Sequence, residues 1–347
     1  MASHPISFFR KVVTPLAIIS AVCVAVPVRA QQPYQVVEHW KIGGTGGWDY
    51  LLSDASAHLL YITHGPRVEV IDSNTGKAVG AITGMQATHG IALDDAGRYG
   101  YISDGGSNAV LVFDRHSFQT VTVIPTGTNP DGIVFDPKTK TVWAFNGRSQ
   151  NVSVIDASKN RVIATVDLPG KPEFPVSDAQ GSVYDNIESA NEIVRLDART
   201  KQIIATWKLK GCDSPSGLAM DRLHRRLFAV CDGGKMAVLD ADTGAQLASP
   251  DIGNGPDAAA FSTKRQLAFS SNGEGTLTVV DAAHGDFPIE TLPTARGART
   301  MAYDESSDRL YLVTAKFGPP PERTAEVPHP RSSVVPGTLE VLVVGRQ

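Results

Sequence analysis

The sequence predicts a seven-bladed β-propeller, an all-β fold in which four-stranded antiparallel blades surround a central channel. Three observations predict it. An aliphatic strand that ends on Asp recurs six times, at intervals of 41–43 residues, and this spacing is typical of one blade. An incomplete seventh repeat lies at the C-terminus, and a lone strand-like segment precedes the first repeat. The six Asp residues are Asp72, Asp114, Asp156, Asp197, Asp240 and Asp281.

Residues 1–30 have the features of a cleavable signal peptide. The segment has no Asp or Glu, and Arg10 and Lys11 precede an apolar run over residues 12–28 that is followed by Arg29 and Ala30. An uncleaved membrane anchor is the alternative, which Pro15 and Pro27 in the apolar run disfavour. We expect a periplasmic or secreted protein whose residues 31–347 form one propeller domain, without a membrane span.

Composition narrows the range of partners. Loss of the three basic residues of the leader leaves 29 basic and 36 acidic residues, a net charge of −7, which disfavours nucleic acid as a partner. The sequence contains no nucleophile-elbow, phosphate-binding-loop, HExxH or dinucleotide-binding motif. We expect a monomer that binds a small molecule or an envelope protein.

Four strand signals recur in order within each repeat. The first is short and rich in small residues, as in HGIALD from His89 and DGIVFD from Asp131. The second begins with an aromatic residue, as in YITHG from Tyr61, and the third is the VxVID phrase that ends on Asp. The fourth, such as KAVGAI, follows a hairpin turn such as Asn74-Thr75-Gly76.

The ends of the chain together supply the last blade. Six complete blades run from Trp48 to about Leu292, and the seventh repeat stops before its fourth strand. Residues 34–44 alternate apolar and polar side chains and resemble a fourth strand. We expect this segment to complete the last blade and to close the ring. The alternative is a loose N-terminal arm. The six Asp residues that end the third strands should bind the backbone of their own turns.

The phrases YITHG, YISDGGSNAVLVFD and WAFNGRSQNVSVID, with PDGIVFDP from Pro130, resemble the YVTN-repeat, YncE-like family of seven-bladed propellers. The resemblance covers nearly all of the expected mature chain and implies the fold, with little information on function. The Pro-rich segment over residues 316–337 looks like an insertion found in exported members, and it could form a lid or a passive loop. Blade four departs most from the repeat, with YDNIES from Tyr184.

Candidate binding residues come from one repeated position. Alignment of the first strands on their trailing Asp or Ser identifies the residue five places earlier, where the strand leaves the channel mouth. Six of these seven residues can ionise, and we call them the mouth ring. They are Asp49, His89, Asp131, Glu173, Ser216, Asp257 and Arg299.

Converging carboxylates repel one another, and a cation relieves this repulsion. Oxygen ligands suit Ca²⁺, whereas histidine admits Zn²⁺ or another transition metal, so the possible cofactor is a divalent ion held by His64, His89, Asp131 and Glu173. The functional expectation is a binding protein for a small ligand, metal ion or protein partner. The alternatives are a metal-dependent hydrolase of the lactonase or esterase type, a scaffold for an envelope complex, and a polar mouth that binds nothing.

Two cysteines remain after the expected cleavage, Cys212 and Cys231. Both lie in the fifth blade, before its first strand and at the end of its second. In an oxidising compartment we expect a disulfide between them, with a free thiol or a metal pair as the alternatives.

Overall fold

A computed structural model describes residues 1–9, 33–320, 322 and 332–346. The chain divides into two units, residues 1–32 and residues 33–347. Residues 1–9 form no helix or strand, and most of the segment interpreted as a signal peptide lies outside the described residues. Among the described residues, no helix has the length and the apolar character needed to cross a membrane.

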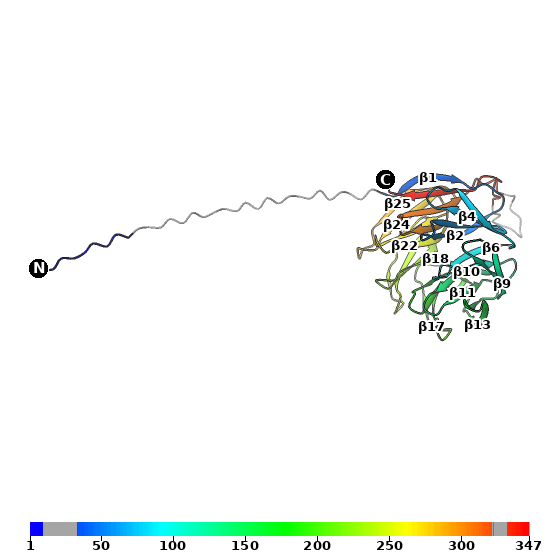
Figure 1. Cartoon of the computed structure of the whole chain (residues 1–347), viewed down its shortest axis with the longest axis horizontal. Coiled ribbons are helices and arrows are strands. Elements are labelled where there is room, and N and C mark those ends of the chain that lie inside the picture. Colours follow the sequence, from blue (N-terminus) through cyan, green and yellow to red (C-terminus); the bar gives the residue numbers. More distant parts are fainter. Residues whose placement is uncertain (10–32, 321, 323–331, 347) are drawn as a thin grey trace. The chain divides into compact units, whose positions relative to one another are not determined.

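The described part of the second unit is the predicted seven-bladed β-propeller, with seven four-stranded antiparallel sheets (Figure 1). The second and third strands of the blades are buried along nearly their whole length, whereas outer fourth strands alternate exposed and partly buried residues. Buried side chains of neighbouring blades pack together in shared apolar clusters. In blade 1 the strands are β2 (Trp48–Asp54), β3 (Leu59–His64), β4 (Arg67–Asp72) and β5 (Ala78–Ile82). In blade 2 they are β6 (Thr88–Leu93), β7 (Tyr99–Asp104), β8 (Ala109–Asp114) and β9 (Thr120–Pro125). In blade 3 they are β10 (Pro130–Asp136), β11 (Thr141–Asn146), β12 (Asn151–Asp156) and β13 (Arg161–Asp167). In blade 4 they are β14 (Pro172–Ser177), β15 (Ser182–Ile187), β16 (Glu192–Asp197) and β17 (Gln202–Lys208), with a short 3₁₀ turn η1 (Glu188–Ala190). In blade 5 they are β18 (Asp213–Asp221), β19 (Arg226–Asp232), β20 (Lys235–Asp240) and β21 (Gln246–Ala248). In blade 6 they are β22 (Pro256–Ser262), β23 (Leu267–Asn272), β24 (Thr276–Asp281) and β25 (Ile289–Pro293). In blade 7 they are β26 (Thr300–Asp304), β27 (Arg309–Thr314), β28 (Glu340–Gly345) and β1 (Gln35–Lys41).

The ring is closed by the two ends of the described propeller, as the sequence predicts. Strand β1 pairs antiparallel with β28, and Gln35 lies opposite Gly345 while Lys41 lies opposite Glu340. In Figure 1 the blue β1 lies beside the red C-terminal strand. The first strands of neighbouring blades contact one another around the channel, including β26 of the last blade and β2 of the first.

Blades 4 and 7 share a packing motif. In blade 7 the indole of Trp40 packs on Tyr311, whose hydroxyl donates to the Ser73 carbonyl of blade 1. In blade 4 Trp207 stacks on Tyr184, whose hydroxyl donates to the Ala241 carbonyl of blade 5. Each indole also covers the glycine of the next blade's hairpin turn, where a Cβ atom would lie within 2.4 Å of the ring. These glycines are Gly76 and Gly244, and both have positive φ.

The Asp residues that end the third strands serve the backbone of their own turns. Asp72 accepts hydrogen bonds from the amides of Asn74 and Thr75, and Asp240 accepts them from Asp242 and Thr243. Hydrogen bonds from the Thr75 and Thr243 hydroxyls, together with these amide hydrogen bonds, lower the pKa of both carboxyl groups. The repeated Asp is therefore a turn-forming residue.

A disulfide joins Cys212 to Cys231, and their Cα atoms are 5.2 Å apart. It ties the loop before β18 to the neighbouring strand β19, and both residues are buried.

Removal of this disulfide is expected to lower the stability of the fold. It closes a loop over a sequence separation of 19 residues, so the Cys212→Ala/Cys231→Ala protein should lose about 2–3 kcal/mol of unfolding free energy. Urea titration with and without reductant measures the loss in the parent and the variant. A variant as stable as the oxidised parent would contradict the expectation.

The Pro-rich insertion is described only at its two ends. Phe317 and Val334 form an antiparallel bridge that brings the ends together. Residues 321 and 323–331, which belong to the segment expected to form a lid or a passive loop, lie outside the described residues.

Candidate functional site

A repeated backbone irregularity places the mouth ring. In six blades the register between the first and second strands shifts at the ring position, as between Thr88 and Ile91 or between Pro130 and Ile133. A bulge of this kind re-aims the side chains that it carries. The ring side chains therefore leave the ladder at the same point in each of these blades.

Glycine directly after the ring residue lets the first strands approach one another closely. A Cβ atom on Gly90 would lie 2.9 Å from the Asp131 carbonyl oxygen, and one on Gly132 would lie 2.3 Å from that of Glu173. Gly217 is equally crowded by blade 6. The backbones are thus close enough to gather the ring side chains at the mouth.

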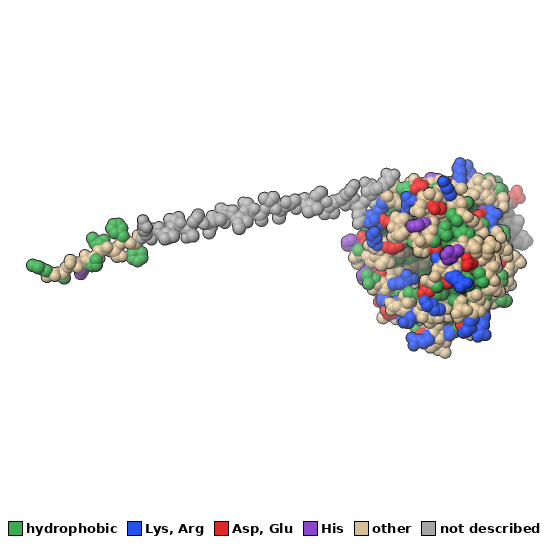
Figure 2. All heavy atoms as spheres, viewed as in Figure 1, with side chains coloured by type: hydrophobic (Ala, Val, Ile, Leu, Met, Phe, Trp, Pro, Cys, Tyr) green, Lys and Arg blue, Asp and Glu red, His purple; other side chains and the backbone are tan. Residues whose placement is uncertain are grey.

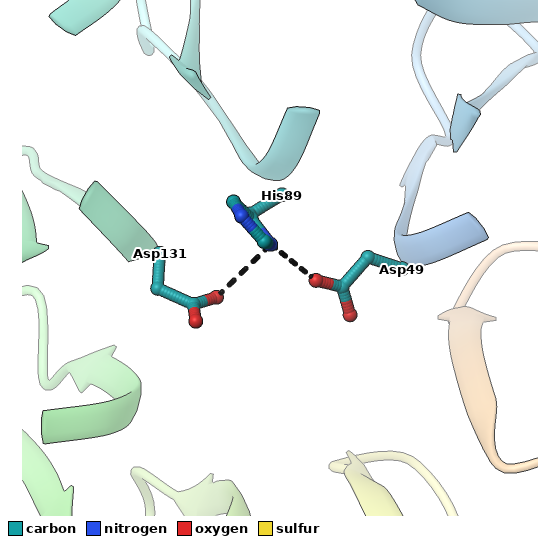
Figure 3. Close-up of side chains that lie close together, drawn as sticks. All are labelled: Asp49, His89 and Asp131. Carbon is teal, nitrogen blue, oxygen red and sulfur yellow. Dashed lines mark hydrogen bonds and ion pairs between the residues drawn. The ribbon is translucent and has the colours of Figure 1, made fainter. Parts of the chain in front are cut away.

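Three ring residues from consecutive blades meet at the mouth. The His89 imidazole lies between two carboxylates, with Nδ1 2.6 Å from Asp49 Oδ2 and 3.7 Å from Asp131 Oδ1 (Figure 3). One ligand atom from each residue lies within 4.8 Å of the other two. Burial alone would lower the pKa of His89, but the hydrogen bond to Asp49 and the charge of Asp131 raise it to about 9.

The acidic groups of the ring are incompletely neutralised. Burial, with repulsion from Asp49, raises the pKa of Asp131 to about 7, although His89 opposes the shift. Burial and the charge of Asp131 likewise raise the pKa of Glu173 to about 7, although Lys171 lies 3.0 Å from its carboxylate. Lys171 also pairs with Glu188, which divides its charge between two partners. The mouth therefore favours any added positive charge.

Blade four contributes a buried carboxyl group that the sequence analysis did not identify. Asp185 lies on β15, where the second strands of blades 1, 2 and 7 carry Ile62, Ile102 and Leu312. It is fully buried, and neither carboxyl oxygen has a well-formed hydrogen bond. Burial raises its pKa well above the ordinary value, and the charges of Glu173 and Asp131 add to the shift. Its signal in the sequence is a charged residue at an apolar position of the repeat.

Two aromatic side chains stack on each other next to the mouth ring. Tyr50 and Phe174 follow Asp49 and Glu173, at the position where three other blades have glycine, and their centroids are 5.1 Å apart in a stacked arrangement. The Tyr50 hydroxyl donates to the Glu173 carbonyl. Both rings line a cavity of about 20 Å³ that Asp49, Glu173 and Asp257 also line, large enough for a water molecule or an ion.

The remaining ring residues lie beside this centre. Asp257 pairs with Arg299, whose Nε lies 3.2 Å from the carboxylate. The Ser216 hydroxyl donates to the Pro256 carbonyl, so it links two blades. Figure 2 shows acidic, basic and apolar side chains mixed over the face in view, without a large area of one charge.

His64, which the sequence analysis places in the metal set, is not part of this centre. Its side chain is buried, and its Nδ1 lies 3.1 Å from Glu69 Oε1. A Cβ atom on Gly44 would lie 2.5 Å from the ring, so the imidazole packs beneath that segment. The group of ligand atoms contains Asp49 in its place.

The donor set of the centre suits a transition metal ion. Two carboxylates and one imidazole are ligands of Zn²⁺ and of similar divalent ions, whereas Ca²⁺ prefers six to eight oxygen ligands. His89 Nδ1 would coordinate only after losing the proton that it donates to Asp49. Glu173 and water are the candidates for the remaining coordination positions.

Comparisons with known proteins bear on the fold. No family model matches the chain, and no curated protein matches it in sequence. Among solved structures, the chain is similar to hydrazine synthase of Kuenenia stuttgartiensis, with a TM-score of 0.69 and 15% identity over 77% of this chain and 92% of that chain. It is also similar to U3-55K, with a TM-score of 0.71 and 10% identity over 89% of this chain and 98% of that chain. These likenesses support a propeller fold.

Proposed function

We propose that the protein is an exported binding protein that holds a divalent transition metal ion at the mouth of its central channel. The observation that carries the proposal is the convergence of Asp49, His89 and Asp131 from three consecutive blades. Export is inferred from the leader-like residues 1–30, and the YVTN-repeat resemblance rests on the repeated phrases.

The charge balance around the centre supports a cation. Asp131 and Glu173 have raised pKa values despite their basic neighbours, and the buried Asp185 makes no ion pair with any residue that the structure describes. A divalent ion would stabilise all three carboxylates in their ionised forms. Carboxylates that are fully exposed to water would not need a cation to stabilise their ionised forms.

Calorimetric titration tests the proposal. Chelator-treated protein is expected to bind one Zn²⁺ with a dissociation constant in the micromolar range or below, and to bind Ca²⁺ at least about tenfold more weakly because of the imidazole ligand. Binding at pH 7.5 should release protons, so the measured enthalpy should depend on the ionisation enthalpy of the buffer. Absence of Zn²⁺ binding, or tighter binding of Ca²⁺, would contradict the proposal.

One observation favours the alternative of a metal-dependent hydrolase. A carboxyl group with a pKa of about 7, such as that of Glu173, can accept and donate protons near neutral pH. Turnover of lactones or aryl esters that EDTA abolishes, and that Glu173→Gln reduces, would establish this activity. Metal binding without such turnover would leave the binding function alone.

A further inference from the structure

A second pocket lies beside the mouth ring and has a different chemical character. Its volume is about 530 Å³, which is within the range of small-molecule sites. Apolar surface comes from Trp48, Phe317, Pro320 and Val334, and positive charge comes from two arginines. The arginines are Arg296 and Arg299.

The aromatic side of this pocket is fixed by specific contacts. Trp48 and Phe317 have ring centroids 6.1 Å apart, and the Trp48 indole N–H donates to Thr300 Oγ1. A Cβ atom on Gly297 would lie 2.5 Å from the Phe317 ring, and Gly297 has a positive φ, so this position requires glycine. The two rings therefore present a preformed surface against which a planar group can pack.

The basic side is held by the loop before β26. The Gly297 amide donates to the Gly273 carbonyl, and the Thr314 hydroxyl donates to the Arg296 carbonyl. Arg299 pairs with Asp257 of the mouth ring, whereas Arg296 makes no ion pair with any described residue. A neutral ligand that covered the Arg296 guanidinium would remove its hydrating water without offering a charged partner. A carboxylate would replace the lost hydration with a charge-assisted hydrogen bond.

We propose that this pocket binds a planar aromatic carboxylate, with the ring against Trp48 and Phe317 and the carboxylate on Arg296 and Arg299. The proposal extends the proposed function, because it names a ligand class for the same mouth. Binding at this pocket does not require the metal ion, because both arginines belong to this chain and Asp49, His89 and Asp131 do not line the pocket.

Titration with 1-naphthoate in the presence of EDTA tests this proposal. We expect one site per chain, with affinity about tenfold lower for Arg296→Met, because a charge-assisted hydrogen-bonded pair is lost. The neutral analogue 1-naphthamide should also bind about tenfold more weakly than 1-naphthoate. Arg148→Met is the matched control, because Arg148 is an exposed arginine outside the residues that line the pocket.

Three results would overturn the proposal. They are absence of 1-naphthoate binding at millimolar concentration, equal affinities for 1-naphthoate and 1-naphthamide, and equal losses of affinity in Arg296→Met and Arg148→Met. Because EDTA is present, the outcome is independent of metal binding. Failure of the Zn²⁺ titration with a normal 1-naphthoate titration would reject the metal site alone, and the reverse pattern would reject the aromatic carboxylate site alone.

Discussion

The Asp131→Asn protein is expected to lose Zn²⁺ affinity by at least about 100-fold and, without metal, to be more stable than the parent at pH 8. The substitution removes a charged ligand from the Asp49–His89–Asp131 group, but it also removes a carboxylate that burial disfavours. The 2.6 Å pair between His89 and Asp49 remains. Calorimetric titration and urea unfolding in EDTA measure the two effects.

The sign of the stability change depends on pH. The pKa of Asp131 is raised from 3.8 to about 7 in the folded protein. Well below pH 3.8 the carboxyl group is protonated in both folded and unfolded states, so it does not affect the stability of the fold. Above pH 7 it is ionised in both states and destabilises the fold, and the destabilisation develops between these limits. The gain from Asp131→Asn should therefore be about 1–3 kcal/mol at pH 8 and close to zero at about pH 3.

Asp167→Asn is the matched control, because Asp167 is an exposed carboxylate at the end of β13. It should leave both Zn²⁺ affinity and stability unchanged. Full Zn²⁺ affinity in Asp131→Asn would contradict the assignment of Asp131 to the metal centre. Lower stability than the parent at pH 8 in EDTA would contradict the conclusion that burial disfavours the ionised carboxylate.

Trp40→Ala is expected to cost about 3–5 kcal/mol of unfolding free energy, the usual cost of truncating a buried aromatic side chain. Trp40 is 7% exposed and packs on Tyr311 and on Gly76, so the indole holds β1 both to its own blade and to blade 1. Because β1 closes the ring, loss of this side chain should also allow β1 to separate locally from the sheet. Urea unfolding and hydrogen exchange of residues 35–41 measure these effects.

Trp207→Ala provides the internal comparison. Trp207 makes the same contacts in blade 4, whose four strands are continuous in sequence. Its removal should lower stability without faster exchange in β1. Equal exchange of β1 in both variants would show that Trp40 contributes packing but does not secure closure.

The repeated phrases predicted the architecture because each blade has the same order of strands and turns and packs in the same way. The 41–43-residue period predicted the blades, and the alternating pattern of residues 34–44 predicted the closing strand. Counting five residues back from the trailing Asp identified His89 and Asp131 because the bulge lies at the same place in their blades. A strictly repeated backbone makes position in the repeat equivalent to position in space.

Departures from the repeat were harder to predict. The position of His64 in the repeat predicts a place at the channel mouth, but its side chain points toward Glu69. Asp185 and Lys171 both belong to blade four, whose sequence differs most from the other repeats, so the repeat did not predict them. Tyr50 and Phe174 occupy a position that favours small residues, and only the structure shows that they meet across the channel. Pairings between distant blades have no local signature in the sequence.

The stacked pair of Tyr50 and Phe174 joins blades 1 and 4 at the position next to the mouth ring. An ion held by Asp49, His89 and Asp131 would therefore lie beside two aromatic rings that contact each other. A planar ligand packed against Trp48 and Phe317 would contact Arg299, which pairs with Asp257, so the ligand and the mouth ring would share one ion pair.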